Sequence, residues 1–332
     1  MKRIASVVLA IVLVAGIPYF GYIGLEGSRR LVHGHDVNTD CRTPAALGMP
    51  YEAINYDIRT DAVLLAREAD PMACSAPGAP AGDEVVTSDG VRLAGWYVPA
   101  AAGIGPDGPT VVLVHGWNDN KSGLLEDLPF FHERYNALLF DLRNTNQSAS
   151  SQTTQGIHEQ RDVLAMLDWL VAEKGPEIIV LWGQSMGGHT AVNVAADDPR
   201  VDGLILDSTH SRIAVPMMNR IRLDHLPFGE VGFLAIVLGA WIRTGVNVMS
   251  DDPITAIDDL GNRPVLIIQP GNDDTIPVSD AEQLLDAALA AGVGARLVIC
   301  PDSGHGGAND ECPGEYQRWV DTFMDRVAAA GG

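Results

Sequence analysis

The chain has 332 residues, of which 46% are hydrophobic and 20% are charged, and 43 acidic side chains stand against 22 basic ones. This composition excludes a disordered chain, because disordered chains carry too few apolar residues to bury a core. A formal net charge of −21, with no basic stripe anywhere, excludes a nucleic-acid-binding protein, because neutralising phosphates requires clustered lysines and arginines.

The amino end carries Lys2 and Arg3 and then an apolar run from Ile4 to Leu25. A helix of that length rises about 33 Å, enough to cross a hydrocarbon core of about 30 Å. We therefore expect residues 1–25 to form a single-pass membrane anchor, with the rest of the chain outside the cytoplasm. The alternative is a cleaved signal peptide, which would make the protein secreted, although the sequence after Gly16 is poor for cleavage.

Four cysteines occur, at positions 41, 74, 300 and 312. An even number beyond a membrane segment fits two disulfides in an oxidising compartment. Three pairings are possible, and Cys41–Cys74 with Cys300–Cys312 is the most local; four unpaired buried thiols are the alternative. No Cys-x-x-Cys spacing occurs, so no metal site is expected.

Residues 26–82 are rich in Asp, Ala, Pro and Gly with weak periodicity, which indicates a tether with irregular packing. Two short strands are expected next, at Glu84–Ser88 and Val91–Val98. They flank Asp89-Gly90, and Asp-Gly between apolar runs is a strong hairpin signal.

After Pro109, apolar runs of strand length alternate with segments of helical periodicity. The expected strands are 111–114, 137–140, 178–182, 204–206, 265–268 and 297–299, and the expected helices include 158–173, 187–196 and 281–291. Continuous apolar strands alternating with helices predict an α/β domain over residues 83–332. Its sheet should be mostly parallel and twisted, with helices on both faces.

Residues 212–262 break this alternation and contain a long apolar stretch, Val231–Ile242. An apolar insertion between two sheet strands predicts a helical lid, and an ordinary pair of packed helices is the alternative. The stretch has only 12 residues, which is too short for a second membrane span.

The residues Gly183-Gln184-Ser185-Met186-Gly187 directly follow an expected strand and open an expected helix. In that setting Gly-x-Ser-x-Gly forms a sharp turn that exposes the serine hydroxyl above the carboxyl end of the sheet. The flanking positions leave no room for side chains, which explains Gly183 and Gly187. Backbone amides at the start of the helix then face any developing oxyanion.

From about Glu84 onward the chain resembles the α/β-hydrolase family, because four further stretches match that family in order. They are the strand ending in His115-Gly116-Trp117, the segment Asp141 to Ser148, the loop Gly271 to Pro277 and the loop Ser303 to Gly307. In the second stretch Asn144 and Asn146 replace glycines; Asn is the next-best residue for left-handed backbone, so the turn can survive.

The resemblance implies a Ser-acid-His triad with Ser185 as nucleophile and His305 as base. Counting from Gly271 favours Asp274 as the acid, whereas counting back from Pro277 favours Asp273, and we expect Asp274. The amides of Trp117 and Met186 would form the oxyanion hole. A bridge between Cys300 and Cys312 would close the loop that carries His305.

These residues predict a membrane-anchored serine hydrolase that cleaves acyl esters through an acyl-enzyme, without metal or organic cofactor. The apolar insertion and the anchor favour a small lipid-like or aliphatic ester as substrate. A peptidase or thioesterase on the same fold is the enzymatic alternative, and a catalytically silent binding protein is the other. No protein partner can be inferred from the sequence.

Overall fold

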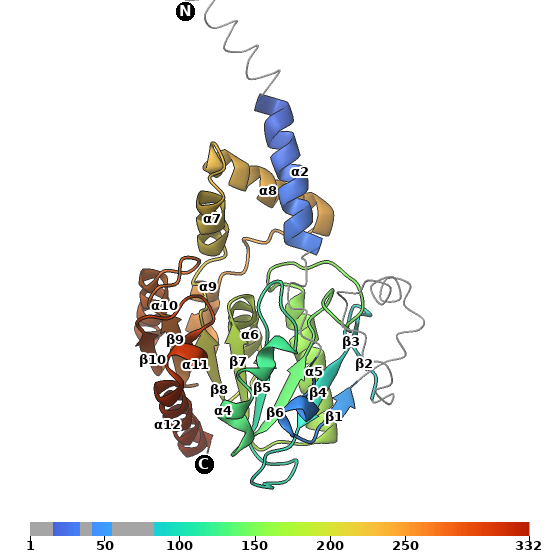
Figure 1. Cartoon of the computed structure of the whole chain (residues 1–332), viewed down its shortest axis with the longest axis vertical. Coiled ribbons are helices and arrows are strands. Elements are labelled where there is room, and N and C mark those ends of the chain that lie inside the picture. Colours follow the sequence, from blue (N-terminus) through green and yellow to red (C-terminus); the bar gives the residue numbers. More distant parts are fainter. Residues whose placement is uncertain (1–15, 34–41, 55–82, 332) are drawn as a thin grey trace, which may run out of the picture.

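The computed structural model describes residues 16–33, 42–54 and 83–331 (Figure 1). Its centre is an eight-stranded sheet with the order β1-β4-β6-β5-β7-β8-β9-β10. Strands β5 to β10 run parallel, whereas β1 and β4 are antiparallel to their neighbours. The expected mostly parallel α/β sheet is therefore confirmed.

The strands lie close to the expected positions. Those of the large sheet are β1 (Glu52–Ile54), β4 (Gly95–Val98), β5 (Thr110–Val114), β6 (Asn136–Phe140), β7 (Ile179–Gln184), β8 (Gly203–Asp207), β9 (Val265–Pro270) and β10 (Ala295–Cys300). The hairpin around Asp89-Gly90 is formed by β2 (Val85–Val86) and β3 (Arg92–Leu93). Strand β1 has no counterpart among the expected elements, because it has only three residues inside a segment of weak periodicity.

Helices cover both faces of the sheet, and each face has its own core. Helices α5 (Glu159–Glu173), α6 (Met186–Asp197) and α10 (Val278–Ala290) pack on one face, through residues such as Met166, Val192 and Leu284. Helices α4 (Pro129–His132) and α12 (Pro313–Gly331) pack on the other, through Phe131 and Phe323. The short elements α11 (Ala308–Glu311), η2 (Pro44–Leu47) and η4 (Gly123–Leu125) lie in connections.

The insertion between β8 and β9 is helical. It consists of α7 (Ala214–Leu223), α8 (Gly229–Thr244), α9 (Pro253–Ala256) and η5 (Ile257–Leu260). Helices α7 and α8 share a third, smaller core with α2 (Ile17–His33), in which Leu31, Ile221 and Ile236 are buried. Figure 1 shows α2 standing beside α8, away from the sheet.

Helix α2 runs through residue 25, where the sequence suggests that an anchor gives way to a tether. Its last turns are fixed to the domain, because Thr153 N–H donates to the Val32 carbonyl and the Gln155 amide donates to the Leu31 carbonyl. Within the described residues, no helix combines the length and the apolar character needed to cross a membrane. Residues 1–15 of the expected anchor, and most of the expected tether, lie outside the described residues.

Candidate active site

Ser185 occupies the turn between β7 and α6, at the carboxyl end of the sheet. Its φ of 54° and ψ of −115° define a strained backbone conformation that residues other than glycine rarely adopt. The turn is held because Ser185 N–H donates to the Asp207 carbonyl at 2.9 Å and His189 N–H donates to the Ser185 carbonyl. Strain of this kind persists only where the surrounding structure imposes it.

The two flanking glycines are required by close backbone contacts. A Cβ at Gly187 would lie 2.0 Å from the Val114 carbonyl oxygen, and one at Gly183 would lie 2.5 Å from the Gly187 carbonyl oxygen. Gly188 is equally confined, because a Cβ there would meet the Thr209 hydroxyl at 1.9 Å. Only glycine allows helix α6 to start this close to strand β5.

His305 lies in the loop after β10, and its Nδ1 is 2.7 Å from Oδ2 of Asp273. The Asp273 carboxylate is buried, and its other oxygen accepts the backbone N–H groups of Thr275 and Ile276, each at 2.8 Å. A carboxylate fixed in this way can hold the imidazole in one orientation and one tautomer.

The expectation that Asp274 is the partner of His305 does not match this geometry. Asp274 is exposed, and its carboxylate accepts the Thr275 hydroxyl at 3.3 Å. Its buried neighbour is the residue whose carboxylate meets Nδ1 of His305. That residue is Asp273, the one indicated by counting back from Pro277.

The loop of His305 lies directly beside the turn of Ser185. The Gln184 side-chain amide donates to the Gly306 carbonyl at 3.4 Å, and a Cβ at Gly306 would meet that same amide. The loop after β5 closes on the other side, because a Cβ at Gly116 would lie 3.4 Å from the Ser185 Cβ. The structure therefore brings three expected stretches together around Ser185.

His115 holds the loop after β5 in place. The Leu142 N–H donates to its Nε2 at 3.0 Å, so Nδ1 carries the proton and donates to the Gly116 carbonyl at 2.8 Å. The ring is fully buried, and both of its nitrogens are engaged in holding the loop. Trp117, two residues on, is partly exposed at the surface of this loop.

Ser208 and Tyr316, which the sequence analysis does not single out, both hydrogen-bond to Asp207, the residue whose carbonyl holds the turn of Ser185. Ser208 donates to the Asp207 carboxylate at 2.8 Å and accepts the Gly306 N–H at 3.0 Å. Tyr316 donates to the other oxygen of Asp207 at 3.0 Å. The only sequence signal is a polar pair, Asp207-Ser208, directly after a buried strand of the sheet.

Asp207 is buried beneath the site, and burial raises the pKa of its carboxyl to about 6. The hydroxyls of Ser208 and Tyr316 act against this rise by stabilising the charged form. Because the Asp207 carbonyl also accepts the Ser185 N–H, one residue braces both the nucleophile turn and the histidine loop.

The remaining stretch that resembles the family, Asp141 to Ser148, follows β6 at the same edge of the sheet as Ser185. Lys121 forms a fully buried ion pair with Asp141, and Arg143 pairs with Asp162 at 2.7 Å. Asn144 and Asn146 have φ values of 65° and 36°, so they adopt the left-handed conformation that glycine would supply.

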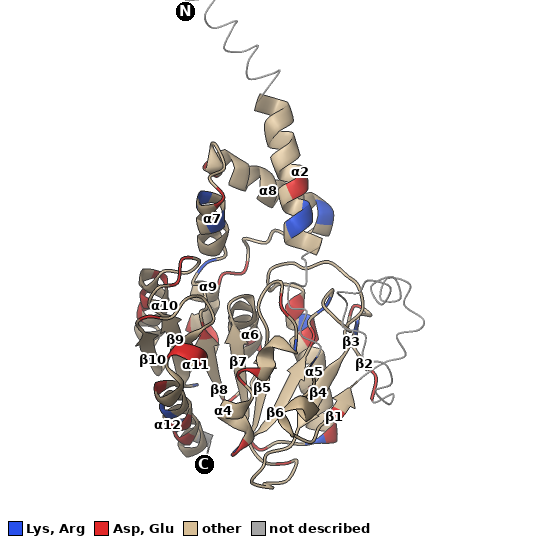
Figure 2. Cartoon of the chain, viewed as in Figure 1, with Lys and Arg blue, Asp and Glu red and all other residues tan. Residues whose placement is uncertain are grey.

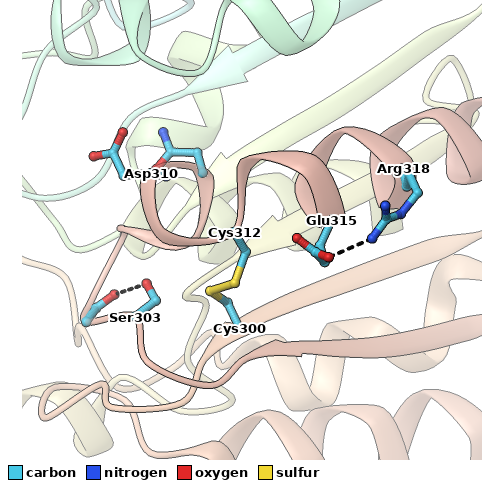
Figure 3. Close-up of a disulfide and its surroundings, with 8 residues drawn as sticks. Cys300, Ser303, Asp310, Cys312, Glu315 and Arg318 are labelled. Atoms are coloured by element: carbon cyan, nitrogen blue, oxygen red, sulfur yellow. Dashed lines mark hydrogen bonds and ion pairs between the residues drawn. A yellow bond between two sulfur atoms is a disulfide. The ribbon is translucent and has the colours of Figure 1, made fainter.

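A disulfide joins Cys300, at the end of β10, to Cys312, which precedes α12 (Figure 3). The bridge encloses the whole loop that carries His305. Figure 3 also shows Ser303 within that loop and the Glu315–Arg318 ion pair at the start of α12. Cys41 and Cys74 lie outside the described residues.

Reduction of this bridge should loosen the histidine loop before the domain unfolds. Closing so short a loop contributes about 3 kcal/mol in the chain-entropy description. We expect the paired Cys300→Ala and Cys312→Ala variant to melt at a lower temperature and to lose catalytic rate, because His305 is less well held. Thermal melts and turnover with and without reductant measure both effects. If the variant keeps the melting temperature and rate of the native chain, the bridge has no such role.

Three comparisons with known proteins show which family and which fold this chain shares. Residues 111–319, more than half of the chain, match the family model described as "Alpha/beta hydrolase family". Among curated proteins, an uncharacterized protein of Mycobacterium tuberculosis is 29% identical over 251 residues, covering 71% of this chain and 77% of its own length. The YfhR protein of Salmonella typhi is 30% identical over 244 residues, covering 68% and 75%.

Solved structures share the fold at low sequence identity. An esterase from Pyrococcus furiosus, Pf2001, has a TM-score of 0.63 and 19% identity, with 86% of this chain and 94% of that chain covered. An acylaminoacyl peptidase from Pyrococcus horikoshii has a TM-score of 0.56 and 17% identity, with coverage of 74% and 40%. Together with the sheet order and the serine turn, the family match shows that the chain belongs to the alpha/beta hydrolase family.

Proposed function

We propose that the protein is a serine hydrolase that cleaves acyl esters through an acyl-enzyme intermediate. The observation that carries this proposal is the hydrogen bond between His305 and a buried carboxylate, Asp273, in a loop lying against the strained turn of Ser185. An oriented imidazole next to a serine hydroxyl that substrate can reach is the arrangement that activates a serine nucleophile.

In the proposed mechanism the Ser185 hydroxyl attacks the acyl carbon while His305 takes its proton. The tetrahedral intermediate collapses when His305 returns that proton to the departing alcohol, which leaves the acyl group on Ser185. Water then attacks the acyl-enzyme with His305 as base, and Ser185 is released with its proton restored. Asp273 stabilises the imidazolium that forms in each half of the reaction.

The oxyanion of each tetrahedral intermediate would be bound by backbone amides. Met186 begins helix α6, where N–H groups have no partner within the helix. Trp117 follows Gly116, and the contact between Gly116 and Ser185 places this loop next to the nucleophile. These two amides are the expected donors, from opposite sides of the turn.

An apolar ester is favoured as substrate because the helical insertion follows β8 directly beside the site. Asn219 of α7 donates to the Thr275 carbonyl, which attaches the insertion to the loop of Asp273. The esterase neighbour has the same fold. A peptidase is the second candidate, because an acylaminoacyl peptidase also shares this fold.

We place the catalytic domain in an oxidising, extracytoplasmic space. The Cys300–Cys312 bridge supports this location, since disulfides persist mainly in such compartments. The apolar sequence from Ile4 to Leu25 supports delivery of the chain to a membrane.

The proposal is tested by labelling the purified full-length chain with a fluorophosphonate, followed by turnover of p-nitrophenyl esters of increasing chain length and of matched aminoacyl amides. We expect labelling and faster turnover of esters than of amides. Faster turnover of amides would favour the peptidase, and absence of labelling and turnover would leave a binding protein.

A further inference from the structure

Helix α8 is apolar around its whole circumference, although the described residues cover only one side of it. Its sixteen residues include three with polar side chains, Glu230, Arg243 and Thr244. Gly232, Ile236 and Ala240 are buried. Large exposed side chains lie on the rest of its surface: Leu234 is 64% and Trp241 54% exposed, and Leu238 at 53% and Ile242 at 77% also line a groove between α8 and α2. A helix that is apolar on every side is normally buried on every side, so this one lacks a cover among the described residues.

The covered side of α8 packs on α2 through small residues. A Cβ at Gly24 would lie 2.8 Å from the Ala235 carbonyl oxygen, and one at Gly239 would lie 2.6 Å from the Gly24 carbonyl oxygen. Close backbone approach through small residues is typical of helix pairs inside lipid, where burial of large side chains gives no gain. This packing leaves the large side chains of both helices on the outside.

The two helices run in the same direction, with their apolar ends away from the sheet. Phe20 contacts Phe228 at one end, and Arg243 donates to the Ser28 hydroxyl and to the Leu25 carbonyl at the other. A groove of about 1340 Å³ lies between them, lined almost entirely by apolar side chains. The pair of helices is therefore apolar at the end away from the sheet and basic at the end nearer to the sheet.

Phe228 lies at the end of the helix pair that is away from the sheet. It is 75% exposed, and its φ of 52° places it in the left-handed region, which is unfavourable for an aromatic residue. A strained backbone conformation that exposes a phenyl ring to solvent persists only where other contacts offset its energetic cost. Exposed Tyr22 and Leu25 extend the same apolar surface along α2.

The charge of this region is opposite to that of the rest of the chain. Residues 17–33 and 212–244 contain six arginines against three carboxylates, in a chain with a net charge of −21. Figure 2 shows both basic and acidic residues on the part of α2 nearer the sheet and basic residues on α7, and acidic residues are scattered over the rest of the domain. The arginines are Arg29, Arg30, Arg212, Arg220, Arg222 and Arg243, and the acids are Glu26, Asp224 and Glu230.

Apolar side chains next to arginines fit the surface of an anionic bilayer. Upstream of α2 the sequence remains apolar back to Ile4, a composition suited to lipid. Helix α8 itself rises about 24 Å, which is less than a hydrocarbon core of about 30 Å. Such a helix lies in the interface instead of crossing it.

We infer that α2 and α8 form one lipid-docking surface that inserts the exposed side of α8 into the interface of an anionic bilayer. The surface lies on the active-site side of the domain, because α7 is attached to the Asp273 loop and α2 to the segment after β6. One part of this inference rests on the proposed function: the substrates would be acyl esters dissolved in that membrane.

The test uses the full-length chain and vesicles of phosphatidylcholine containing about one third phosphatidylglycerol. Leu234→Glu with Leu238→Glu should lower the partition coefficient in flotation by at least about tenfold, because two charges would enter apolar lipid. The matched control is Leu289→Glu on α10, at a residue 52% exposed outside the docking surface, which should bind like the native chain. Brominated lipid should quench fluorescence in the native chain more than in Trp241→Phe.

Turnover of a water-soluble short ester separates this inference from the proposed function. The α8 variants should keep that turnover, since they lie outside the catalytic residues, and should lose turnover of esters embedded in vesicles. If the proposed function fails, there is no ester turnover at all, but flotation still depends on α8. Equal flotation of all variants without quenching at Trp241 would overturn the docking surface. A native dimer without lipid that the α8 variants dissociate would assign the surface to a second copy instead.

Discussion

Replacement of Ser185 by alanine should abolish fluorophosphonate labelling and reduce ester turnover by about a millionfold, the typical cost of losing a triad nucleophile. The reason is chemical, since no acyl-enzyme can form without the hydroxyl. Alanine is close in size to serine, so the turn, held by the Asp207 carbonyl, should persist. Steady-state turnover and probe labelling measure the effect, and a thermal melt confirms that the variant is folded.

The matched control is Ser279→Ala, at an exposed serine on α10. It should label and turn over substrate like the native chain. Substantial labelling of the Ser185 variant would instead show that the probe reacts elsewhere, and the nucleophile would have to be sought among the other residues of the site.

The two adjacent aspartates should differ by several orders of magnitude in their effect on turnover. Asp273→Asn should lower the turnover number by about ten-thousandfold, because an amide facing Nδ1 stabilises the wrong tautomer of His305. Asp274→Asn should change it by no more than about threefold, since an exposed carboxylate bonded to a neighbouring hydroxyl contributes little. Turnover of one ester by both purified variants decides the ranking.

Thermal melts of the two variants serve as the control for folding, because Asp273 also accepts two backbone N–H groups of its own loop. A side-chain oxygen of asparagine can still accept these groups, so the loop should stay formed. The reverse ranking, with Asp274→Asn the more damaging, would mean that the loop rearranges when substrate binds.

The sequence predicts the sheet and the serine turn well because both depend on local patterns. Apolar runs of three to five residues mark the buried parallel strands, and the glycines on either side of Ser185 mark a turn whose flanking positions have no room for a side chain. The left-handed conformations of Asn144 and Asn146 follow from the same backbone preferences.

Other features depend on contacts between distant segments, which spacing cannot reveal. The orientation of a loop decides between Asp273 and Asp274, although the two residues are chemically identical. Ser208 acquires its place only when the loop after β10 lies against it. The packing of α2 on α8 joins segments that are far apart in the sequence. The apolar sequence of either helix alone does not indicate that it contacts the other.

The close contact between Gly24 and Gly239 makes substitutions in α2 and in the insertion depend on each other, although the two segments look independent in the sequence. A larger residue at either position would push the two helix backbones apart. If the insertion containing α8 were exchanged between relatives by itself, it would lack the matching α2 helix on which it packs. Among homologues, the amino-terminal helix and the insertion should therefore vary together, as a single inherited module beside a sheet that varies on its own.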